Sequence, residues 1–235
     1  RYQVLLGKSL LSFAPAGDRR GKWIVALPTT STVAKRLHRE AQALRELRTM
    51  NLAMSRLSPR LLTEANLGPQ SVFVQEELRG VPIDESFRRL DDLTRTAVDH
   101  LLQFHRETAE YSTVGEEVFR AHFDRTIDHA RVAFGPDVGG PLDAIRRALH
   151  EHIQGWKLPI VWTHGDYKLE NILVNPRTRR VTGVIDWDLS DRHGLPLIDL
   201  YYLLSYNRLL KGGDRSPIVR IDPAIRDTLA PADRA

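Results

Sequence analysis

One segment of the chain reads His164-Gly165-Asp166-Tyr167-Lys168-Leu169-Glu170-Asn171, and Val184-Ile185-Asp186-Trp187-Asp188 follows it. Asn171 comes five positions after Asp166, and Asp186 comes fifteen positions after Asn171. Carboxylate and amide oxygens are the ligands that a hard cation such as Mg²⁺ prefers. The three side chains therefore predict a cation site beside phosphate groups, with one carboxylate close to an acceptor hydroxyl.

Short strands are predicted around these three residues. They cover residues 160–163, 172–174 and 181–185, with a turn at 175–177. This arrangement puts Asp166 and Asn171 on one connection and Asp186 at the end of a hairpin, so that all three face one cleft. Their order is that of the kinase catalytic loop and magnesium-binding Asp. Asp and Asn also occur in turns because they tolerate turn geometry, but three placed residues with these strands between them favour phosphoryl transfer.

The N-terminal third of the chain reads as strands followed by one helix. Residues 2–6, 10–14 and 22–27 are predicted as strands of a β-meander with a turn at 17–21, and residues 72–78 as a further strand. Between them, apolar residues recur at helical spacing behind a Thr/Ser cluster that predicts an N-cap before Ser31. The turn Gly80-Val81-Pro82 then marks a boundary between two lobes.

The rest of the chain is predicted to be mainly helical outside the Asp166 hairpin. Helices are expected over residues 93–107, 116–134 and 141–154 and from Leu197 onward, with a loop at 135–141 and an irregular tail after Gly212.

Composition excludes several classes of protein. The 235 residues carry a net charge of +4, and their 34 Lys and Arg are spread among 30 Asp and Glu, which disfavours a nucleic-acid partner. There is no Cys, which excludes disulfides and thiolate metal sites and fits a cytoplasmic location. No apolar run approaches the roughly 18 to 20 residues that a membrane span needs. The chain begins at Arg1 rather than Met, so we allow for a longer native protein.

The motifs together resemble the aminoglycoside phosphotransferase family, relatives of choline kinases and protein kinases. The resemblance is carried by His164-Gly165-Asp166, Asn171-Ile172-Leu173, Ile185-Asp186-Trp187, Gly194, Pro196 and Asp199-Leu200, and more weakly by Glu76-Glu77-Leu78 through Gly80-Val81-Pro82 and by residues 101–105. It implies a bilobal α+β fold of the protein-kinase-like type. Residues 1–78 would form a small β-rich nucleotide-binding lobe with one long helix, and residues 79–235 a larger, mainly helical catalytic and substrate-binding lobe.

The resemblance also implies a role for each matching residue. Asp166 would be the catalytic base or hydroxyl-orienting group, and Asn171 and Asp186 would hold Mg²⁺ with ATP. Backbone atoms of Glu76, Glu77 and Leu78 would meet adenine. Lys168 coincides with the lysine that neutralises charge on the moving phosphoryl group, although a solvated surface lysine explains it equally well.

Glu40 lies on the inward stripe of the predicted helix, so its carboxylate needs a partner. In the kinase-like family this helix Glu pairs with a basic residue on the preceding strand, and that residue holds the phosphates. The position of the basic residue is occupied here by Ala26. Lys22 shares the strand face but lies about 13 Å away at strand rise, and Lys8, Lys35 and Arg39 are alternatives of which none stands out.

Other residues near the motifs receive structural interpretations. His105 is expected to pack in the core, His164 to orient the Asp166 loop, Asp199 to cap or brace a helix start, and Asp188 to need no function. Gly7-Lys8-Ser9 is not the end of a P-loop, because Tyr2 stands where the motif requires glycine.

The sequence therefore predicts an ATP- and Mg²⁺-dependent phosphotransferase acting on a hydroxyl of a small molecule. A protein substrate is disfavoured because no Ala-Pro-Glu motif follows Asp186. The alternative is a catalytically weak or inactive kinase-like regulatory domain, which Ala26 keeps open. Antibiotic, choline-like amine, sugar and amino-alcohol acceptors are all compatible with the sequence.

Overall fold

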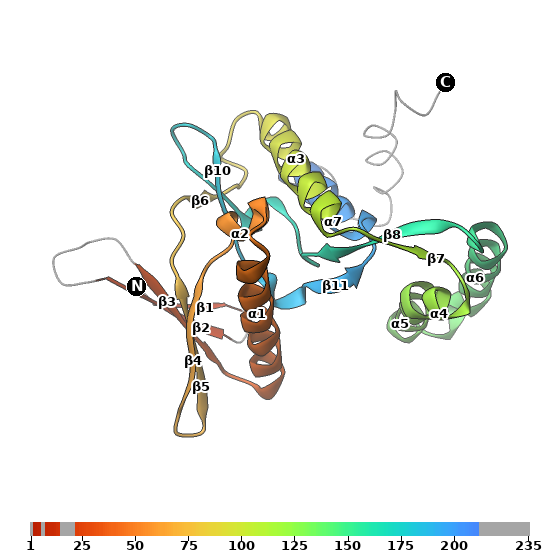
Figure 1. The fold of residues 1–235 in the computed structure, drawn as a ribbon, viewed down its shortest axis with the longest axis horizontal. Coiled ribbons are helices and arrows are strands. Elements are labelled where there is room, and N and C mark those ends of the chain that lie inside the picture. Colours follow the sequence, from red (N-terminus) through yellow and green to blue (C-terminus); the bar gives the residue numbers. More distant parts are fainter. Residues whose placement is uncertain (1, 6–7, 15–21, 212–235) are drawn as a thin grey trace.

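The computed structural model describes residues 2–5, 8–14 and 22–211, whose arrangement is shown in Figure 1. A β-rich N-terminal part lies at one end, and a mainly helical part extends to the other. This mixture of helices and antiparallel sheets confirms the predicted α+β class. The turn expected at 17–21 and the tail expected after Gly212 lie outside the described residues.

Five antiparallel strands form the N-terminal sheet in the order β1-β2-β3-β5-β4. Their bounds are β1 Tyr2–Leu5, β2 Lys8–Phe13, β3 Trp23–Pro28, β4 Leu61–Leu67 and β5 Gln70–Glu76. The four predicted strands are confirmed, with ends shifted by up to two residues. The edge strand β4 was not predicted, because most of its side chains are exposed and it lacks an alternating apolar pattern.

One long helix, α1 (Ser31–Met50), packs on this sheet, as predicted. Thr30 caps it, since its hydroxyl accepts a hydrogen bond from the Val33 N–H at 3.2 Å. Leu37 and Ala41 of α1 pack with Ala26 of β3 and Phe73 of β5 in a small apolar cluster. A short helix that was not predicted, α2 (Ala53–Leu57), follows α1.

The larger core lies beyond the N-terminal sheet, between two helices and two three-stranded sheets. The helices are α3 (Leu90–Thr108) and α7 (Leu197–Leu210), and the sheets have the strand orders β10-β9-β6 and β11-β8-β7. The strand bounds are β6 Val81–Pro82, β7 Glu110–Thr113, β8 Lys157–Thr163, β9 Ile172–Val174, β10 Val181–Val184 and β11 Asp191–Gly194. The predicted hairpin of residues 172–185 and the helix start at Leu197 are confirmed.

Aromatic side chains fill the centre of this core. Phe104, Trp162, Tyr167 and Trp187 are each at most 2% exposed. Burying four rings removes several hundred Å² of apolar surface from water, which stabilises the fold. Because Tyr167 and Trp187 directly follow Asp166 and Asp186, this burial anchors both segments that carry the predicted site.

A helical group lies at the far end of the molecule, beyond β7 and β8 (Figure 1). It comprises α4 (Glu116–Phe119), a π-helical turn (Arg120–Asp124), α5 (Arg125–Phe134), a 3-10 turn (Pro136–Val138) and α6 (Gly139–Ile153). The predicted loop at 135–141 was wrong at its end, because residues 139–141 form the first turn of α6. Pro141 is tolerated there, since the first N–H groups of a helix have no intrahelical partner.

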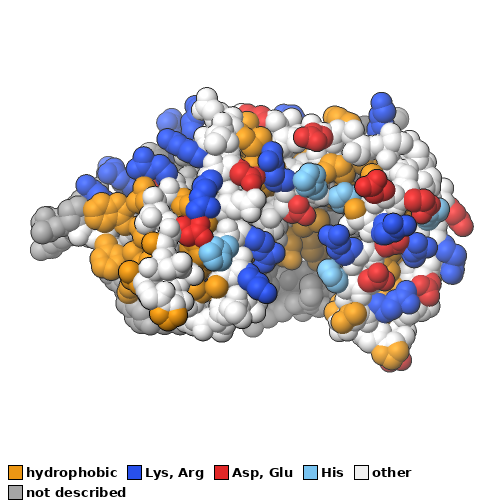
Figure 2. Space-filling view, turned by 60° about the horizontal axis from the view of Figure 1, so that its bottom comes forward, with side chains coloured by type: hydrophobic (Ala, Val, Ile, Leu, Met, Phe, Trp, Pro, Cys, Tyr) orange, Lys and Arg blue, Asp and Glu red, His pale blue; other side chains and the backbone are white. Residues whose placement is uncertain are grey.

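Charged side chains of both signs alternate over this helical group in the face shown in Figure 2. The distribution agrees with the expectation that basic residues are spread among acidic ones rather than gathered. None of the helices in the described ranges combines the length and the apolar character needed to cross a membrane.

Residues 77–80 connect β5 of the N-terminal sheet to β6 of the second part. The predicted lobe boundary between residues 78 and 79 falls within this connection.

Candidate active site

Asp166 and Asn171 contact each other directly. The Asn171 side-chain amide donates hydrogen bonds to Asp166 Oδ2 at 3.0 Å and to the Asp166 backbone oxygen at 2.9 Å. Both bonds use Nδ2, so the amide is oriented with Oδ1 left to accept a cation. Asn171 ends a 3-10 turn (Leu169–Asn171) immediately before β9, which positions it at the strand end.

Asp186 is held beside this pair by the partner strand of the hairpin. The N–H of Ile185 donates to the backbone oxygen of Asn171 at 3.0 Å, which places the two predicted cation ligands on neighbouring backbones. Asp186 adopts the left-handed conformation, with φ 72° and ψ 54°. This conformation is uncommon for a residue other than glycine and is tolerated best by Asn and Asp. It turns the chain out of β10 into the short 3-10 helix Trp187–Leu189.

Lys8 makes the closest contact with Asp186. Its Nζ lies 2.5 Å from Asp186 Oδ1, although the two residues are 178 positions apart. Burial acts to raise the pKa of Asp186, but the charge and hydrogen bond of Lys8 outweigh it and leave that pKa below its ordinary value. Asp186 is therefore ionised at neutral pH, as a cation ligand must be.

Glu40 of α1 faces the same cluster from the other side and is only 5% exposed. Burial raises the pKa of Glu40 to about 7, while the nearby charge of Lys8 and a hydrogen bond from the Trp187 backbone act in the opposite direction. The positive charge that acts on Glu40 thus comes from Lys8 of β2 rather than from residue 26 of β3.

A second ion pair lies next to the first. Arg36 Nε is 2.9 Å from Asp188 Oδ2, and Arg36 Nη2 donates to Asp188 Oδ1 at 3.3 Å. Asp188 is 4% exposed, and burial together with the charge of Asp186 raises its pKa. The ion pair attaches the segment after Asp186 to α1. This structural contact agrees with the expectation that Asp188 needs no role in the chemistry.

Lys168 points back at the loop that carries it. Its Nζ lies 3.0 Å from Asp166 Oδ2 and 3.9 Å from Glu170 Oε2, and it is 5.1 Å from the centre of the Tyr206 ring. Burial acts to lower the pKa of Lys168, but the hydrogen bond and charge of Asp166 raise it overall. The side chain is only 19% exposed, so the interpretation of Lys168 as a solvated surface lysine was wrong.

A buried network holds the Asp166 loop from behind. The Asp199 carboxylate accepts hydrogen bonds from the N–H groups of His164 and Gly165, and His164 Nδ1 accepts one from the Asp166 N–H at 3.3 Å. His164 Nε2 lies 3.0 Å from the oxygen of Ile185, and burial lowers the pKa of His164. A neutral His164 that donates from Nε2 satisfies both contacts. His164 therefore orients the loop as predicted, and it also joins the loop to the Asp186 strand.

The structural interpretation of His105 is confirmed. His105 is 5% exposed and packs in the core, with Nε2 3.4 Å from Asp199 Oδ2. The carboxylate of Asp199 braces the Asp166 loop through His164 and Gly165, and its predicted role at a helix start stays a prediction. A resemblance carried by single residues does not reveal this bracing, because it depends on a contact across 35 positions.

The predicted hinge begins where β5 ends, between β3 and β4 of the N-terminal sheet. The N–H groups of Glu76 and Glu77 donate to the backbone oxygens of Arg60 at 2.9 Å and Lys22 at 3.0 Å. The Glu77 side chain accepts a hydrogen bond from Ser12 at 2.6 Å. These bonds fix the hinge backbone, and contact of Glu76, Glu77 and Leu78 with adenine stays a prediction.

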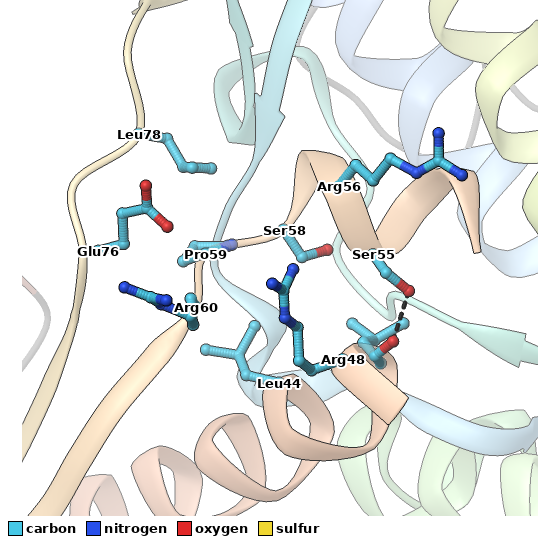
Figure 3. Close-up of a pocket in the computed structure, with 10 residues that line it drawn as sticks. Leu44, Arg48, Ser55, Arg56, Ser58, Pro59, Arg60, Glu76 and Leu78 are labelled. Atoms are coloured by element: carbon cyan, nitrogen blue, oxygen red, sulfur yellow. Dashed lines mark hydrogen bonds between the residues drawn. The ribbon is translucent and has the colours of Figure 1, made fainter. Parts of the chain in front are cut away.

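The side chains of Glu76 and Leu78 line a pocket behind the hinge, shown in Figure 3. Its other walls come from the end of α1, from α2 and from the residues before β4, and they include Leu44, Arg48, Ser58 and Arg60. This pocket does not include any of the Asp166, Asn171 and Asp186 side chains.

The donor set fits a magnesium ion bound together with a nucleotide. Asp186 offers an ionised carboxylate and Asn171 an amide oxygen, and Mg²⁺ is usually held by one or two protein groups with phosphates and water completing the octahedron. Within residues 2–5, 8–14 and 22–211 there is no cluster of three or more His, Asp or Glu side chains suited to a metal. Asp186 and Asn171 would leave the remaining coordination positions of such an ion to phosphate oxygens and water.

Solved aminoglycoside phosphotransferases share this fold over nearly the whole chain. APH(3'')-Id from Streptomyces rimosus, in complex with ADP and streptomycin, matches with a TM-score of 0.59 at 18% identity over 98% of this chain and 86% of that one. A thermostable mutant of APH(4)-Ia, in complex with ADP and hygromycin B, matches with a TM-score of 0.58 at 14% identity over 95% and 82%. The kinase-like fold implied by the resemblance is confirmed.

Curated relatives match a much shorter stretch. Acyl-CoA dehydrogenase family member 11 of Mus musculus is 52% identical over 40 residues, and that of Gallus gallus is 44% identical over 43 residues. These stretches cover 17% and 18% of this chain, and the chain spans only 5% of the length of either relative. A model of the phosphotransferase enzyme family, by contrast, matches residues 11–222. This match covers most of the chain, which therefore belongs to the phosphotransferase enzyme family.

Proposed function

We propose that the chain is an ATP- and Mg²⁺-dependent kinase that transfers the γ-phosphoryl group to a hydroxyl of a small molecule. The observation that carries this proposal is the contact between Asp166 and Asn171. It holds the Asn171 side-chain amide against the Asp166 carboxylate, so that Asp166 would serve the acceptor and the Asn171 amide oxygen would serve a cation. The ionised Asp186 lies on the adjoining backbone.

Each side chain has a defined task in the transfer. Asp166 accepts the proton of the acceptor hydroxyl as the new bond from oxygen to the γ-phosphorus forms and the bond to the β-phosphate oxygen breaks, so that ADP leaves. Lys168 lies 3.0 Å from Asp166 and offsets negative charge on the moving phosphoryl group. Asn171 and Asp186 would hold Mg²⁺, which supplies positive charge beside the phosphates.

Two observations on relatives support this nucleotide and this class of acceptor. The two solved relatives described above hold ADP together with streptomycin or hygromycin B. The likeness at these identities is one of fold.

A regulatory domain without turnover is the second candidate, because residue 26 is Ala. The contact between Lys8 and Asp186 weakens this alternative, since it supplies a cation next to Glu40 where the predicted strand position has none. Nucleotide binding without ADP release on any acceptor would favour it.

An ADP-release screen tests the proposal. Aminoglycosides, choline-like amines, sugars and amino alcohols are each incubated with the protein, ATP and Mg²⁺. Release that depends on one class of acceptor is expected from the unmodified chain and should be lost in Asp166→Asn. Glu170→Gln is the matched control, because Glu170 lies on the same loop with a half-exposed carboxylate. Equal release from Asp166→Asn and the unmodified chain would refute the assignment.

We also propose the cytoplasm as the location and the lobe boundary between residues 78 and 79. The absence of Cys from the sequence supports the first, and the connection of the two parts through residues 77–80 supports the second.

A further inference from the structure

We propose that Lys8 of β2 is the residue that holds the nucleotide phosphates, in place of a basic residue on β3. The proposal rests on the phosphotransferase function above and assigns a further residue to the same site. It explains how this chain dispenses with a basic residue at position 26.

Position 26 lies in an apolar environment that disfavours a cation. Ala26 is 4% exposed and packs with Leu37, Ala41 and Phe73, while Leu10 of β2 covers it from the neighbouring strand. A lysine head group in this cluster would be surrounded by apolar side chains, which is costly for a charge. The sheet therefore uses this position for packing between β3 and α1.

Lys8 reaches the site from the adjacent strand. It pairs with Pro28 in the β2–β3 register, while Leu10 pairs with Ala26, so Lys8 lies on the same face of the sheet one alternation further along. Its side chain is 15% exposed, and its Nζ is 2.5 Å from Asp186. Asp186 and Glu40 are the two acidic groups whose charges act most strongly on it.

The other candidate cations do not have this environment. Lys22, Lys35 and Arg39 are exposed, and Arg36 is engaged with Asp188. Of the cations named above, Lys8 is the one whose contact with Asp186 is seen in the described part of the chain.

The contact also has a consequence for the order of binding. Lys8 neutralises the same carboxylate that would hold Mg²⁺, and a buried charge is expensive to leave without a partner. When phosphates bind, Lys8 gives up its contact with the Asp186 carboxylate and contacts a phosphate oxygen instead. The Asp186 carboxylate is then available to the cation. Nucleotide and Mg²⁺ should then bind cooperatively.

Two binding measurements test this role without requiring an acceptor. In Lys8→Met the affinity for ATP with Mg²⁺ should fall by about 10- to 100-fold, the range expected for losing a charged hydrogen bond. The affinity for Mg²⁺ alone should rise, because Asp186 has lost its competing cation. Lys8→Arg, which keeps the charge, should retain most of the nucleotide affinity. Lys35→Met is the matched control, since it removes an exposed lysine from α1 and should change neither affinity.

The outcomes separate this inference from the proposed function. If Lys8→Met binds ATP with Mg²⁺ as tightly as the unmodified chain while Asp186→Ala does not, the role of Lys8 is wrong and the magnesium site stands. If Asp186→Ala also binds normally, the proposed site itself fails. Should Lys8→Met not fold, as judged by circular dichroism, Lys8→Gln is measured in its place, and a nucleotide affinity equal to that of the unmodified chain overturns the inference.

Discussion

Asp199 holds His164 by its backbone: the carboxylate Oδ2 accepts the His164 N–H at 2.7 Å, and Oδ1 accepts the N–H of Gly165 at 2.8 Å. Asp199 is fully buried, so neither N–H has water as a substitute. These two hydrogen bonds attach the Asp166 loop to the first turn of α7. Its position depends on packing between α3, α7 and the core rather than on local turn chemistry.

Asp199→Asn should loosen this loop. An Asn amide presents only one acceptor oxygen, so one of the two buried N–H groups loses its partner, at a cost of about 1–3 kcal/mol. We expect a lower urea midpoint and reduced turnover, with nucleotide affinity changed much less. Asp191→Asn, at an exposed position in β11, is the control. Equal midpoints for both variants would contradict the bracing role.

Substitution of Asp186 should remove nucleotide binding, whereas substitution of Asp166 should remove turnover. Asp186→Ala should abolish magnesium-dependent nucleotide binding, because it deletes the ionised cation ligand. Asp166→Ala should retain binding and lower turnover by about 10²- to 10⁴-fold, the usual contribution of a general base. Calorimetric titration with ATP and Mg²⁺, together with ADP release, measures both. Unchanged turnover in the two variants would show that the roles are misassigned.

Gly165→Ala should lower the free energy of unfolding by far more than the positive φ of Gly165 alone would explain. Gly165 has φ +82°, and a Cβ built there would overlap the backbone oxygen of Leu189. Gly135 is a matched control, because it has the same φ of +82° and no atom within 4 Å of its Cβ position. We expect Gly135→Ala to cost about 1–3 kcal/mol, because a φ of 82° with a ψ of −173° is a conformation that essentially only glycine adopts. Gly165→Ala should exceed it by several-fold in urea unfolding and should impair turnover as well.

Glu40 should make stability depend on pH in a defined window. Because its pKa is about 7 in the folded chain and 4.5 in its ordinary range, the folded state keeps a proton that the unfolded state loses between these values. The free energy of unfolding contributed by Glu40 therefore falls as pH rises from 4.5 to 7 and is constant above 7.

Glu40→Gln removes this titration. Relative to the unmodified chain, the variant should gain stability progressively from pH 4.5 to 7, by up to about 3 kcal/mol at 1.4 kcal/mol per pKa unit. Urea unfolding at half-unit pH intervals measures the difference. Curves that stay parallel over this window would contradict the assigned state of Glu40.

Most secondary structure was predictable because its signals are local. The α1 helix follows from apolar spacing and the Thr30 cap, and the hairpin of β9 and β10 from two apolar runs around the turn at Asn175. By contrast, β4 exposes most of its side chains, and α6 begins with Gly-Gly-Pro, so local patterns there gave no signal or a misleading one.

The contact of Asp166 with Asn171 was also within reach of the sequence, since five positions and one short turn separate them. The surroundings of this pair were not. The sequence alone is equally compatible with Lys168 as a surface residue. The structure shows that its side chain is enclosed between the Tyr206 ring and Asp166 of its own loop.

The sequence by itself determined the kinase-like order of elements and the three oxygen-bearing side chains, because these depend on spacing along one short stretch of chain. Only the tertiary structure decided which cation meets Glu40 and Asp186. That choice depends on the β2–β3 register and on the packing of α1 against the sheet. Both are set by burial of apolar side chains contributed by distant segments, and a change of one residue in strand register would turn Lys8 to the opposite face.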